Sequence, residues 1–406
     1  DYHEASPAAV ESAPQREAAA PRWGDRLQMT PSQQESILKP AGWMHYRYPF
    51  IYGQPDTRQF PLATWRSAAN WLHGGVRDPA WVIDHIDQDV PMLIEQIRTR
   101  VLPKRGIVAA PDEILITLGS QNALYLLTRL LLSSTTRIGV ENPCFREAIN
   151  TFLLADAEVV PHPVDEEGIV LNERPCDYYY VTPGHQVPTG VTMSSARRRQ
   201  LLEHAARHDA VIIEDDYDSE SNFTLNPLPA LKASDRSGRV VYVSSLSKAL
   251  SPGLRLGFMV ADPDLIDEAR ALRRLVYRHP PTNIQYQMAH FLAQGHYETH
   301  LRRYHYDSAQ RWERLHAALQ RYLPSCRALA GSEHANAFWL QTPAQINTQQ
   351  LTWRAAHAGV LIEPGARHFL NAAPPDNYFR MGFHAINPDA IAQGVEVLRG
   401  QLEQMG

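Results

Sequence analysis

The sequence predicts an α/β protein: a large domain built on a mostly parallel sheet, and a small C-terminal α+β domain. Short apolar runs without clean alternation recur between amphipathic stretches from residue 61 onward, as expected of parallel strands covered by helices on both faces. After Gly257 the pattern changes to longer helical stretches. The length of 406 residues accommodates two such domains.

The chain divides into four expected parts. Residues 1–31 are rich in Ala, Pro, Glu, Ser and Gln with little periodicity, a composition typical of a linker-like arm. An N-terminal segment, 32–75, precedes the large domain, 76–280. Helices between the domains and the small domain itself occupy 281–406. A cleft between the two domains is the natural place for a ligand.

Apolar periodicity places the elements in order. Strands are expected at 113–118, 137–140, 178–181, 210–213 and 240–243, and helices at 93–101, 123–132, 145–154 and 194–208. The last of these helices carries Arg197, Arg198 and Arg199, which we interpret as a solvated face rather than a nucleic-acid patch. Later helices are expected at 264–276, 284–292, 299–322 and 388–404, with strands at 361–362 and 378–383.

Composition excludes several functions. Lys and Arg number 39 against 44 Asp and Glu, so a net charge of -5 argues against nucleic-acid binding through these residues. Cys144, Cys176 and Cys326 are far apart and predict neither disulfides nor a zinc site, which favours a reduced, cytoplasmic protein. No apolar run approaches the roughly 20 residues that span a bilayer, so no membrane partner is expected. The 18 histidines lack metal-ligand spacing, so no metal is expected.

A lysine, Lys248, follows the expected strand 240–243. A lysine at the end of a buried strand is unfavourable unless it is neutralised or bonded, and imine formation with an aldehyde gives it a chemical reason to be there. The hydroxyls of Ser245 and Ser247 and the guanidinium of Arg255 suit a phosphate dianion. A strand end with a solvated lysine is the alternative, and this segment alone does not separate the two.

Acidic residues follow the strand 210–213, in Glu214-Asp215-Asp216-Tyr217. Open α/β sheets bind ligands at the carboxyl ends of their strands. A carboxylate there can keep a pyridine nitrogen protonated, which makes the ring an electron sink. The tyrosine can hydrogen-bond a phenolic oxygen on the same ring. A solvated acidic loop is the alternative.

Three further positions suit the same ligand. Gly119-Ser120-Gln121 joins a strand to a helix, and free N–H groups at a helix N-terminus bind phosphate. Phe145 follows another strand and offers an aromatic face. Arg380 lies between apolar residues, and its fork matches a carboxylate. An ordinary N-capped turn and a core aromatic ring are the alternatives for the first two. Arg367 is a candidate second arginine for the ligand's side chain.

Together these pieces resemble, in one order from about Tyr52 to the C-terminus, the fold-type-I pyridoxal-phosphate enzymes of the aminotransferase class I/II group. The resemblance implies the aspartate-aminotransferase-like fold, a homodimer, an amino acid ligand and pyridoxal 5'-phosphate as cofactor. It implies three catalytic residues: Lys248 as the Schiff-base lysine, Asp215 on the pyridine nitrogen and Tyr217 on the phenolic oxygen. Arg380 would hold the substrate carboxylate. The cofactor-binding set would be Gly119, Ser120, Gln121, Phe145, Asp215, Tyr217, Ser245, Ser247, Lys248 and Arg255.

Within this group, the segments 181–186, 214–220 and 278–281 resemble the MocR-type subgroup, in which an aminotransferase-like domain follows a winged helix-turn-helix and a linker. Most aminotransferases carry an asparagine before Pro-Thr-Gly, where this chain has Val187. The phenolic oxygen would therefore rely on Tyr217 alone, or on His185 or Gln186.

Two functions stay open. The first is a pyridoxal-phosphate enzyme acting on an amino acid, in the first place an aminotransferase. The second is the cofactor- and effector-binding sensor of a MocR-type transcription regulator without its helix-turn-helix. The cofactor motifs suit both. The lack of a DNA-binding module in this chain favours the enzyme, whereas the linker-like start and the MocR-like segments favour the sensor.

Overall fold

A computed structural model describes residues 22–37, 39–75, 80–221, 223, 227–328 and 335–405. Contacts divide the chain into two units, residues 1–35 and 36–406. In the first unit the described part holds two short 3-10 turns, Trp23–Arg26 and Pro31–Gln33, neither with a buried residue. Most of the expected arm, residues 1–21, lies outside the described residues.

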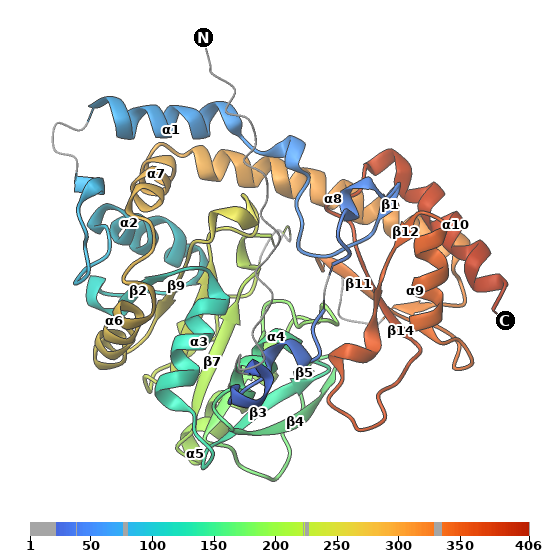
Figure 1. The fold of residues 1–406 in the computed structure, drawn as a ribbon, viewed down its shortest axis with the longest axis horizontal. Coiled ribbons are helices and arrows are strands. Elements are labelled where there is room, and N and C mark those ends of the chain that lie inside the picture. Colours follow the sequence, from blue (N-terminus) through green and yellow to red (C-terminus); the bar gives the residue numbers. More distant parts are fainter. Residues whose placement is uncertain are drawn as a thin grey trace. The chain divides into compact units, whose positions relative to one another are not determined.

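The second unit contains an eight-stranded sheet in the order β2-β9-β8-β7-β6-β3-β4-β5 (Figure 1). The five strands β8, β7, β6, β3 and β4 run parallel to their neighbours in that order, whereas β9 pairs antiparallel with β2 and β8, and β5 with β4. The predicted mostly parallel sheet is therefore confirmed. The strands are β2 Ile114–Thr117, β3 Arg137–Asn142, β4 Glu158–Asp165, β5 Gly168–Ile169, β6 Tyr178–Val181, β7 Val211–Asp216, β8 Val240–Ser245 and β9 Gly257–Val260.

Helices cover both faces of this sheet, and for that reason its strands read as unbroken apolar runs. Ile212 and Ile213 are adjacent on β7, yet they belong to two separate core clusters. The first cluster contains Leu201 of α5 and the second contains Phe152 of α4. The helices of this region are α2 Pro91–Gln96, α3 Ser120–Leu131, α4 Arg146–Leu153, α5 Ser195–Arg207 and α6 Pro263–Tyr277.

A second, antiparallel sheet has the order β10-β11-β14-β13. Its strands are β10 Arg327–Ala328, β11 Ala337–Gln341, β13 Glu363–Pro364 and β14 Tyr378–Gly382. The remaining helices of the second unit are α1 Leu62–Gly75, α7 Thr282–Ala293, α8 His296–Tyr322, α9 Thr348–His357 and α10 Ile391–Glu403. This sheet shares one core cluster with α8, α9 and α10, and these elements form the small α+β part that the sequence predicts, whereas α1 and α7 pack in a core cluster of the large sheet.

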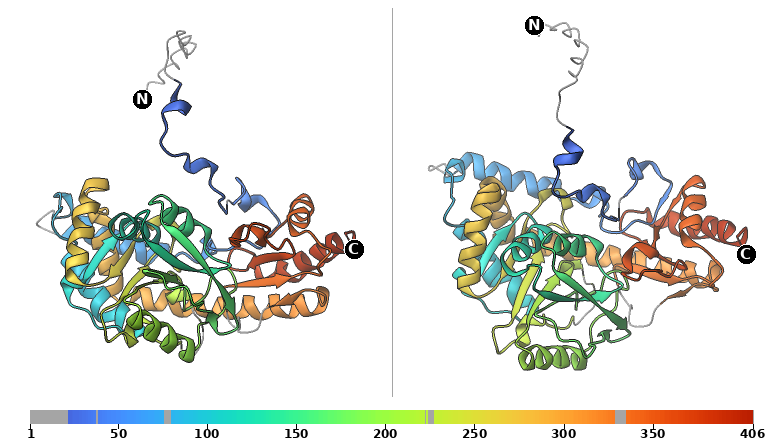
Figure 2. Two further views of the ribbon diagram at one scale, coloured as in Figure 1. Left: turned by 90° about the horizontal axis from the view of Figure 1, so that it is seen from below. Right: turned by 60° about the horizontal axis from the view of Figure 1, so that its bottom comes forward.

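The N-terminal segment joins this small part through a strand that the sequence pattern did not indicate. β1, Tyr48–Pro49, pairs in parallel with β12, Val360–Leu361. In Figures 1 and 2 the blue segment around β1 accordingly lies beside the orange and red C-terminal part. Phe50, next to β1, is fully buried in the core of the small part. The pairing brings the residues after β1 toward the large sheet.

The interpretation of the three arginines on α5 as a solvated face is wrong for two of them, because the side chain of Arg197 is only 11% exposed and pairs with Asp165, and Arg198 is buried as well. Arg198 is only 7% exposed, and its guanidinium donates hydrogen bonds to the carbonyl oxygens of Met193, Pro183 and Pro229 at 2.8–3.0 Å. A guanidinium has five N–H donors in a fixed fork, so one side chain can hold three loop carbonyls. Arg198 therefore fastens loops together and is not part of a solvated face.

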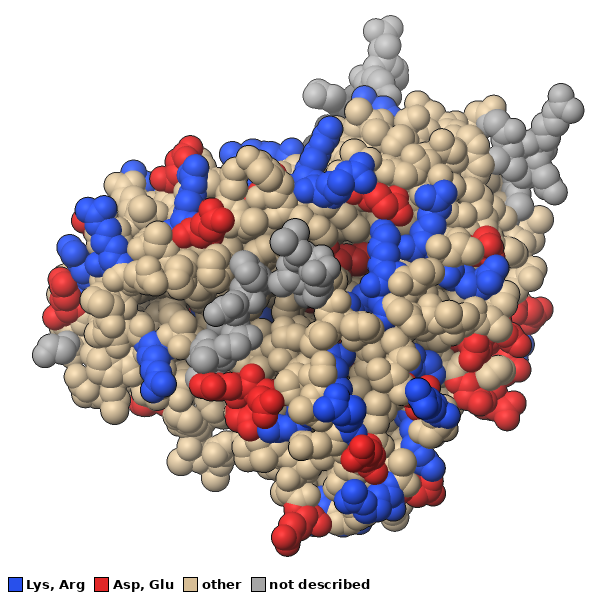
Figure 3. Space-filling model, turned by 180° about the vertical axis from the view of Figure 1, so that it is seen from behind, with Lys and Arg blue, Asp and Glu red and all other residues tan. Residues whose placement is uncertain are grey.

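The surface shows both signs of charge. On the face opposite that of Figure 1, Lys and Arg side chains lie among Asp and Glu side chains (Figure 3). Among the described residues, no helix is long and apolar enough to cross a membrane. The same residues contain no group of three or more His, Cys, Asp or Glu side chains that could hold a metal ion.

Candidate active site

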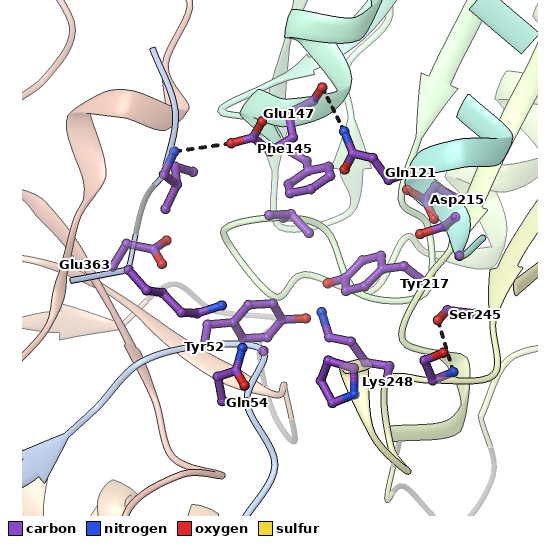
Figure 4. A pocket seen from close by; sticks show the side chains of 18 of the residues that line it. Tyr52, Gln54, Gln121, Phe145, Glu147, Asp215, Tyr217, Ser245, Lys248 and Glu363 are labelled. Atoms are coloured by element: carbon purple, nitrogen blue, oxygen red, sulfur yellow. Dashed lines mark hydrogen bonds between the residues drawn. The ribbon is translucent and has the colours of Figure 1, made fainter. Parts of the chain in front are cut away.

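A cavity of about 410 Å³ lies where β7 and β8 end, which is the edge at which parallel sheets bind ligands. All eleven residues expected at the site line it, so the fold gathers them from five separate stretches of chain (Figure 4). They are Gly119, Ser120, Gln121, Phe145, Asp215, Tyr217, Ser245, Ser247, Lys248, Arg255 and Arg380.

Lys248 lies in the turn after β8, with its Nζ atom 4.3 Å from the ring centre of Tyr52 and 4.7 Å from that of Tyr217. Burial lowers the pKa of Lys248 to about 8; the charges of Asp218 and Asp215 oppose this shift. A lysine with a lowered pKa carries more neutral amine at physiological pH, and the neutral amine is the nucleophile. The environment therefore suits a lysine that attacks a carbonyl carbon.

Asp215 is 2% exposed and lies at the end of β7. Its Oδ2 atom accepts a hydrogen bond from the hydroxyl of Tyr180 at 2.8 Å, whereas its Oδ1 atom is buried with no hydrogen-bond partner among the described residues. Burial raises the pKa of Asp215 to about 7, although the hydrogen bond from Tyr180 opposes it. An unsatisfied buried acceptor is unfavourable. A protonated pyridine nitrogen would satisfy it, so this residue fits the cofactor.

The wall expected to hold phosphate is formed around the N-terminus of α3. Gly119 precedes the helix with a φ of 82°, and a Cβ there would lie 2.9 Å from Nη2 of Arg255. Only glycine lets the guanidinium approach the helix N-terminus so closely. The hydroxyl of Ser247 both donates to and accepts from the backbone of Leu256. Ser245 accepts one bond, from the backbone N–H of Ser247, and keeps its proton for a phosphate oxygen.

The remaining walls of the cavity contain the residues that are expected to contact the ring of the cofactor. Figure 4 shows the side chains of Phe145 and Tyr217 at the cavity, and Val187 lines it where most aminotransferases have asparagine. The hydroxyl of Tyr217 lies 3.2 Å from the carbonyl oxygen of His185. The amide of Gln186 donates to the carbonyl oxygens of Pro143 and Val187. Neither His185 nor Gln186 lines the cavity. Of the three candidates for the hydrogen bond to the phenolic oxygen, only Tyr217 therefore has its side chain at the cavity.

Arg380 projects from β14 between apolar neighbours, with its guanidinium carbon 3.6 Å from the ring centre of Tyr52. Its Nη1 atom is 3.8 Å from Oε1 of Glu363, a loose contact. Its Nε atom is buried without a hydrogen-bond partner in the described part of the chain. The guanidinium therefore has unused donors that face a cavity, as a carboxylate-binding arginine requires.

Several lining residues were missed by the sequence analysis. Tyr52 accepts cation–π contacts from both Lys248 and Arg380, and the turn-forming Tyr52-Gly53-Gln54-Pro55-Asp56 was the one signal that could have indicated it. The other missed lining residues reach the cavity through tertiary contacts with no local motif. They are Ile37, Lys39, Glu147, Pro252, Glu363 and His368, while Gly53 and Gln54 line the cavity next to Tyr52. Arg367 does not line the cavity; it donates to the backbone oxygen of Ser36 at 2.8 Å.

The fold and this cavity define the class of protein. Residues 87–397 match the family described as aminotransferase class I and II, and the chain belongs to that family. Two solved structures are similar over most of their length. The α-aminoadipate aminotransferase LysN of Thermus thermophilus, complexed with N-(5'-phosphopyridoxyl)-L-leucine, has a TM-score of 0.83 at 25% identity, covering 94% of this chain and 98% of that one. Kynurenine aminotransferase of Pyrococcus horikoshii has a TM-score of 0.81 at 26% sequence identity, and the match covers 87% of this chain and 90% of that one.

Curated relatives are of two kinds. The HTH-type transcriptional regulator TauR of Rhodobacter capsulatus is 39% identical over 86% of this chain and 72% of its own length. The probable rhizopine catabolism regulatory protein MocR of Rhizobium meliloti is 33% identical over 87% of this chain and 72% of its own length. The 2-aminoadipate transaminase of Thermus thermophilus is 31% identical over 73% and 78%. The predicted fold and the MocR-type resemblance are confirmed, and the family together with the phosphopyridoxyl complex implies use of pyridoxal phosphate.

Proposed function

We propose that this chain binds pyridoxal phosphate through Lys248 and an amino acid or related amine at the same site, and that it serves as the effector-sensing domain of a MocR-type transcription regulator. The observation that carries the cofactor site is the unsatisfied Oδ1 atom of Asp215 across the cavity from a lysine of lowered pKa. The sensor role is supported by the 39% and 33% identities to two regulators.

Each wall of the cavity would have one task. Pyridoxal phosphate, when bound, supplies an aldehyde that condenses with amines and a ring that accepts electrons. Asp215 would hold a proton at the pyridine nitrogen, because its free oxygen is a buried acceptor. Ser245, Arg255 and the N–H groups at the start of α3 would bind the phosphate.

The substrate end would be handled by two cations. The Nζ atom of Lys248 would exchange protons with the α-carbon of the ligand once its amine is free. Arg380 would bind the ligand carboxylate with its unused donors and fix the direction of the α-carbon. Phe145 would stack against the ring and exclude water from one face.

An aminotransferase is the second candidate, and the presence of both Lys248 and Asp215 at the cavity favours it. A sensor needs cofactor and ligand binding but no turnover, whereas an enzyme needs both carboxylate and lysine for proton transfer. The 31% identity to a 2-aminoadipate transaminase supports this alternative. In either role we propose a homodimer, as the family resemblance implies, and a cytoplasmic protein, as the cysteine pattern favours.

The test uses purified protein loaded with pyridoxal phosphate. Borohydride should attach the cofactor to one peptide, the one containing Lys248; label on Lys232, the nearest lysine earlier in the chain, would overturn the assignment. A panel of amino acids should then change the absorbance of the bound cofactor. A spectral change without keto-acid formation supports the sensor, and stoichiometric keto acid supports the aminotransferase. No spectral change with any amine would reject both.

A further inference from the structure

The chain before β1 contributes to the cavity wall and is tied there by two contacts. The Nη1 atom of Arg367 donates to the backbone oxygen of Ser36 at 2.8 Å. The backbone N–H of Ile37 points to Oε1 of Glu147 at 3.4 Å, drawn as a dashed line in Figure 4. Ile37 itself lines the cavity. These contacts place the next described residue, Lys39, at the same wall.

Lys39 has an exposed stem, but its ammonium end lies in the cavity. A Cβ on Gly53 would be 3.8 Å from Nζ of Lys39 and 3.5 Å from Nζ of Lys248. Gly53 has a φ of 75°, so the absence of a side chain there leaves room between the two amines. Loss of water lowers the pKa of Lys39, with the charge of Glu363 opposing and that of Arg380 reinforcing the shift.

Glu363 neutralises these cations only in part, because its carboxylate is shared with a histidine. The Nδ1 atom of His368 lies 2.9 Å from the carbonyl oxygen of Cys144, and its Nε2 atom 2.8 Å from Oε1 of Glu363. A carbonyl oxygen only accepts, so Nδ1 carries a hydrogen. The second contact then needs one more proton, on Nε2 or on the carboxyl group. In both cases the His368–Glu363 pair has no net charge.

The wall with Lys39 and Arg380 therefore has two cations and the shared carboxylate of Glu363, while Glu147, another acid that lines the cavity, accepts from the backbone N–H of Ile37. Among the described residues, Lys39 has no ion-pair contact within 4.0 Å, and Arg380 has only the loose contact with Glu363. Buried or half-buried cations are unfavourable without a counter-charge. Figure 4 shows Glu363, an acidic residue near both cations, across the cavity from Asp215 and Ser245. A ligand with a second anionic group would supply a counter-charge to these cations.

We propose that Lys39 and Arg380 together select amino compounds that carry two anionic groups, with Arg380 binding one carboxylate and Lys39 the acid at the end of a short side chain. Amino dicarboxylates are the ligand class that two cations at one cavity would recognise. The inference rests on the proposed function, since it concerns the same cavity.

The experiment measures dissociation constants by titrating the cofactor-loaded protein and following cofactor absorbance. The probes are matched in shape: L-aspartate against L-asparagine, L-glutamate against L-glutamine, and L-2-aminoadipate against L-norleucine. In the wild type, at least one acidic probe should bind about tenfold or more tightly than its neutral partner, because a charge-assisted contact is gained. Lys39→Met should remove that preference, whereas Lys39→Arg should keep most of it.

A matched control is Lys104→Met, which removes a half-exposed lysine that pairs with Glu298 instead. It should leave every ratio unchanged. If the wild type shows no preference, or Lys39→Met keeps it, the subsite is rejected while the proposed function stands. If Lys39→Met no longer holds the cofactor, Lys39 serves the cofactor and the subsite is also rejected. If no probe of either kind changes the spectrum, the proposed function itself fails.

Discussion

The two sides of the carboxyl end of β7 treat neighbouring carboxylates differently. Asp216 accepts hydrogen bonds from Nε of Arg105 at 2.7 Å and from the hydroxyl of Tyr242 at 2.8 Å. Asp215, one residue earlier, has one partner, Tyr180, and a buried oxygen with none among the described residues. Successive side chains of a strand point to opposite faces. One carboxylate is thus satisfied by the fold, and the other is reserved for a ligand.

Glu214, the residue before Asp215, is satisfied by the fold in the same way as Asp216. Its two oxygens accept from the backbone N–H groups of Leu231 and Lys232 at 2.7 and 2.8 Å, so it fastens a loop. Three consecutive acids therefore have three environments, and only one lines the cavity. The difference teaches that a binding residue is identified by hydrogen-bonding capacity that the protein leaves unused, more than by residue type.

The first prediction tests the structural role of Asp216 by removing its partner, Arg105. Arg105→Met should lower the free energy of unfolding of the cofactor-free protein by about 3–5 kcal/mol, because a buried carboxylate loses its counter-charge. Urea denaturation measures the change. Arg239→Met is the control: its pair with Asp209 is exposed, and its loss should be under about 1 kcal/mol. Equal losses in the two variants would contradict a structural role for Asp216.

Replacing Lys248 should raise the free energy of unfolding, whereas replacing Arg105 should lower it. Burial lowers the pKa of Lys248 from its ordinary 10.5 to about 8, so its stabilising contribution is complete above pH 10.5 and is lost as pH falls through 8. At pH 7, Lys248→Met should therefore stabilise the cofactor-free protein by up to about 3 kcal/mol, while borohydride no longer traps any cofactor. The stability difference between the two proteins should shrink as pH rises from 7 to 10. A difference that stays constant with pH would contradict this account.

The smallest of the three effects concerns Asp215. Asp215→Asn should weaken cofactor binding by about 2 kcal/mol, because a charge-assisted hydrogen bond becomes a neutral one. In the cofactor-free protein, burial raises the pKa of Asp215 to about 7. Its contribution to stability is thus present below about pH 4 and lost as pH rises through 7. The variant should lose less stability over that range in urea titrations. Asp209→Asn, at an exposed site, should change neither quantity.

Local chemistry allowed much of the site to be predicted. The strands β7 and β8 are recognisable because burial on both faces requires a continuous apolar run, and Asp215, Tyr217 and Lys248 follow those strands within a few residues. A parallel sheet brings the carboxyl ends of such strands to one edge. The residues therefore meet without any long-range information beyond the strand order.

Other parts could not be predicted, because they depend on contacts between distant segments. Lys39 and Tyr52 reach the cavity because β1 pairs with β12, some 310 residues later in the chain, and because Arg367 holds Ser36. Arg367 was a candidate for the ligand pocket, but its side chain serves the backbone instead. Nothing in the local pattern distinguishes an arginine that binds a ligand from one that binds a carbonyl oxygen.

The sequence by itself determined the mostly parallel α/β fold, the family resemblance and the residue types of the cofactor site, because these depend on burial patterns and on motifs that follow strands. Only the tertiary structure shows that Lys39 and Tyr52 reach the cavity, and that Glu363 is matched by His368 while Lys39 is not. Charge balance in a cavity is a sum over side chains from distant segments. That sum is defined only after the chain has folded.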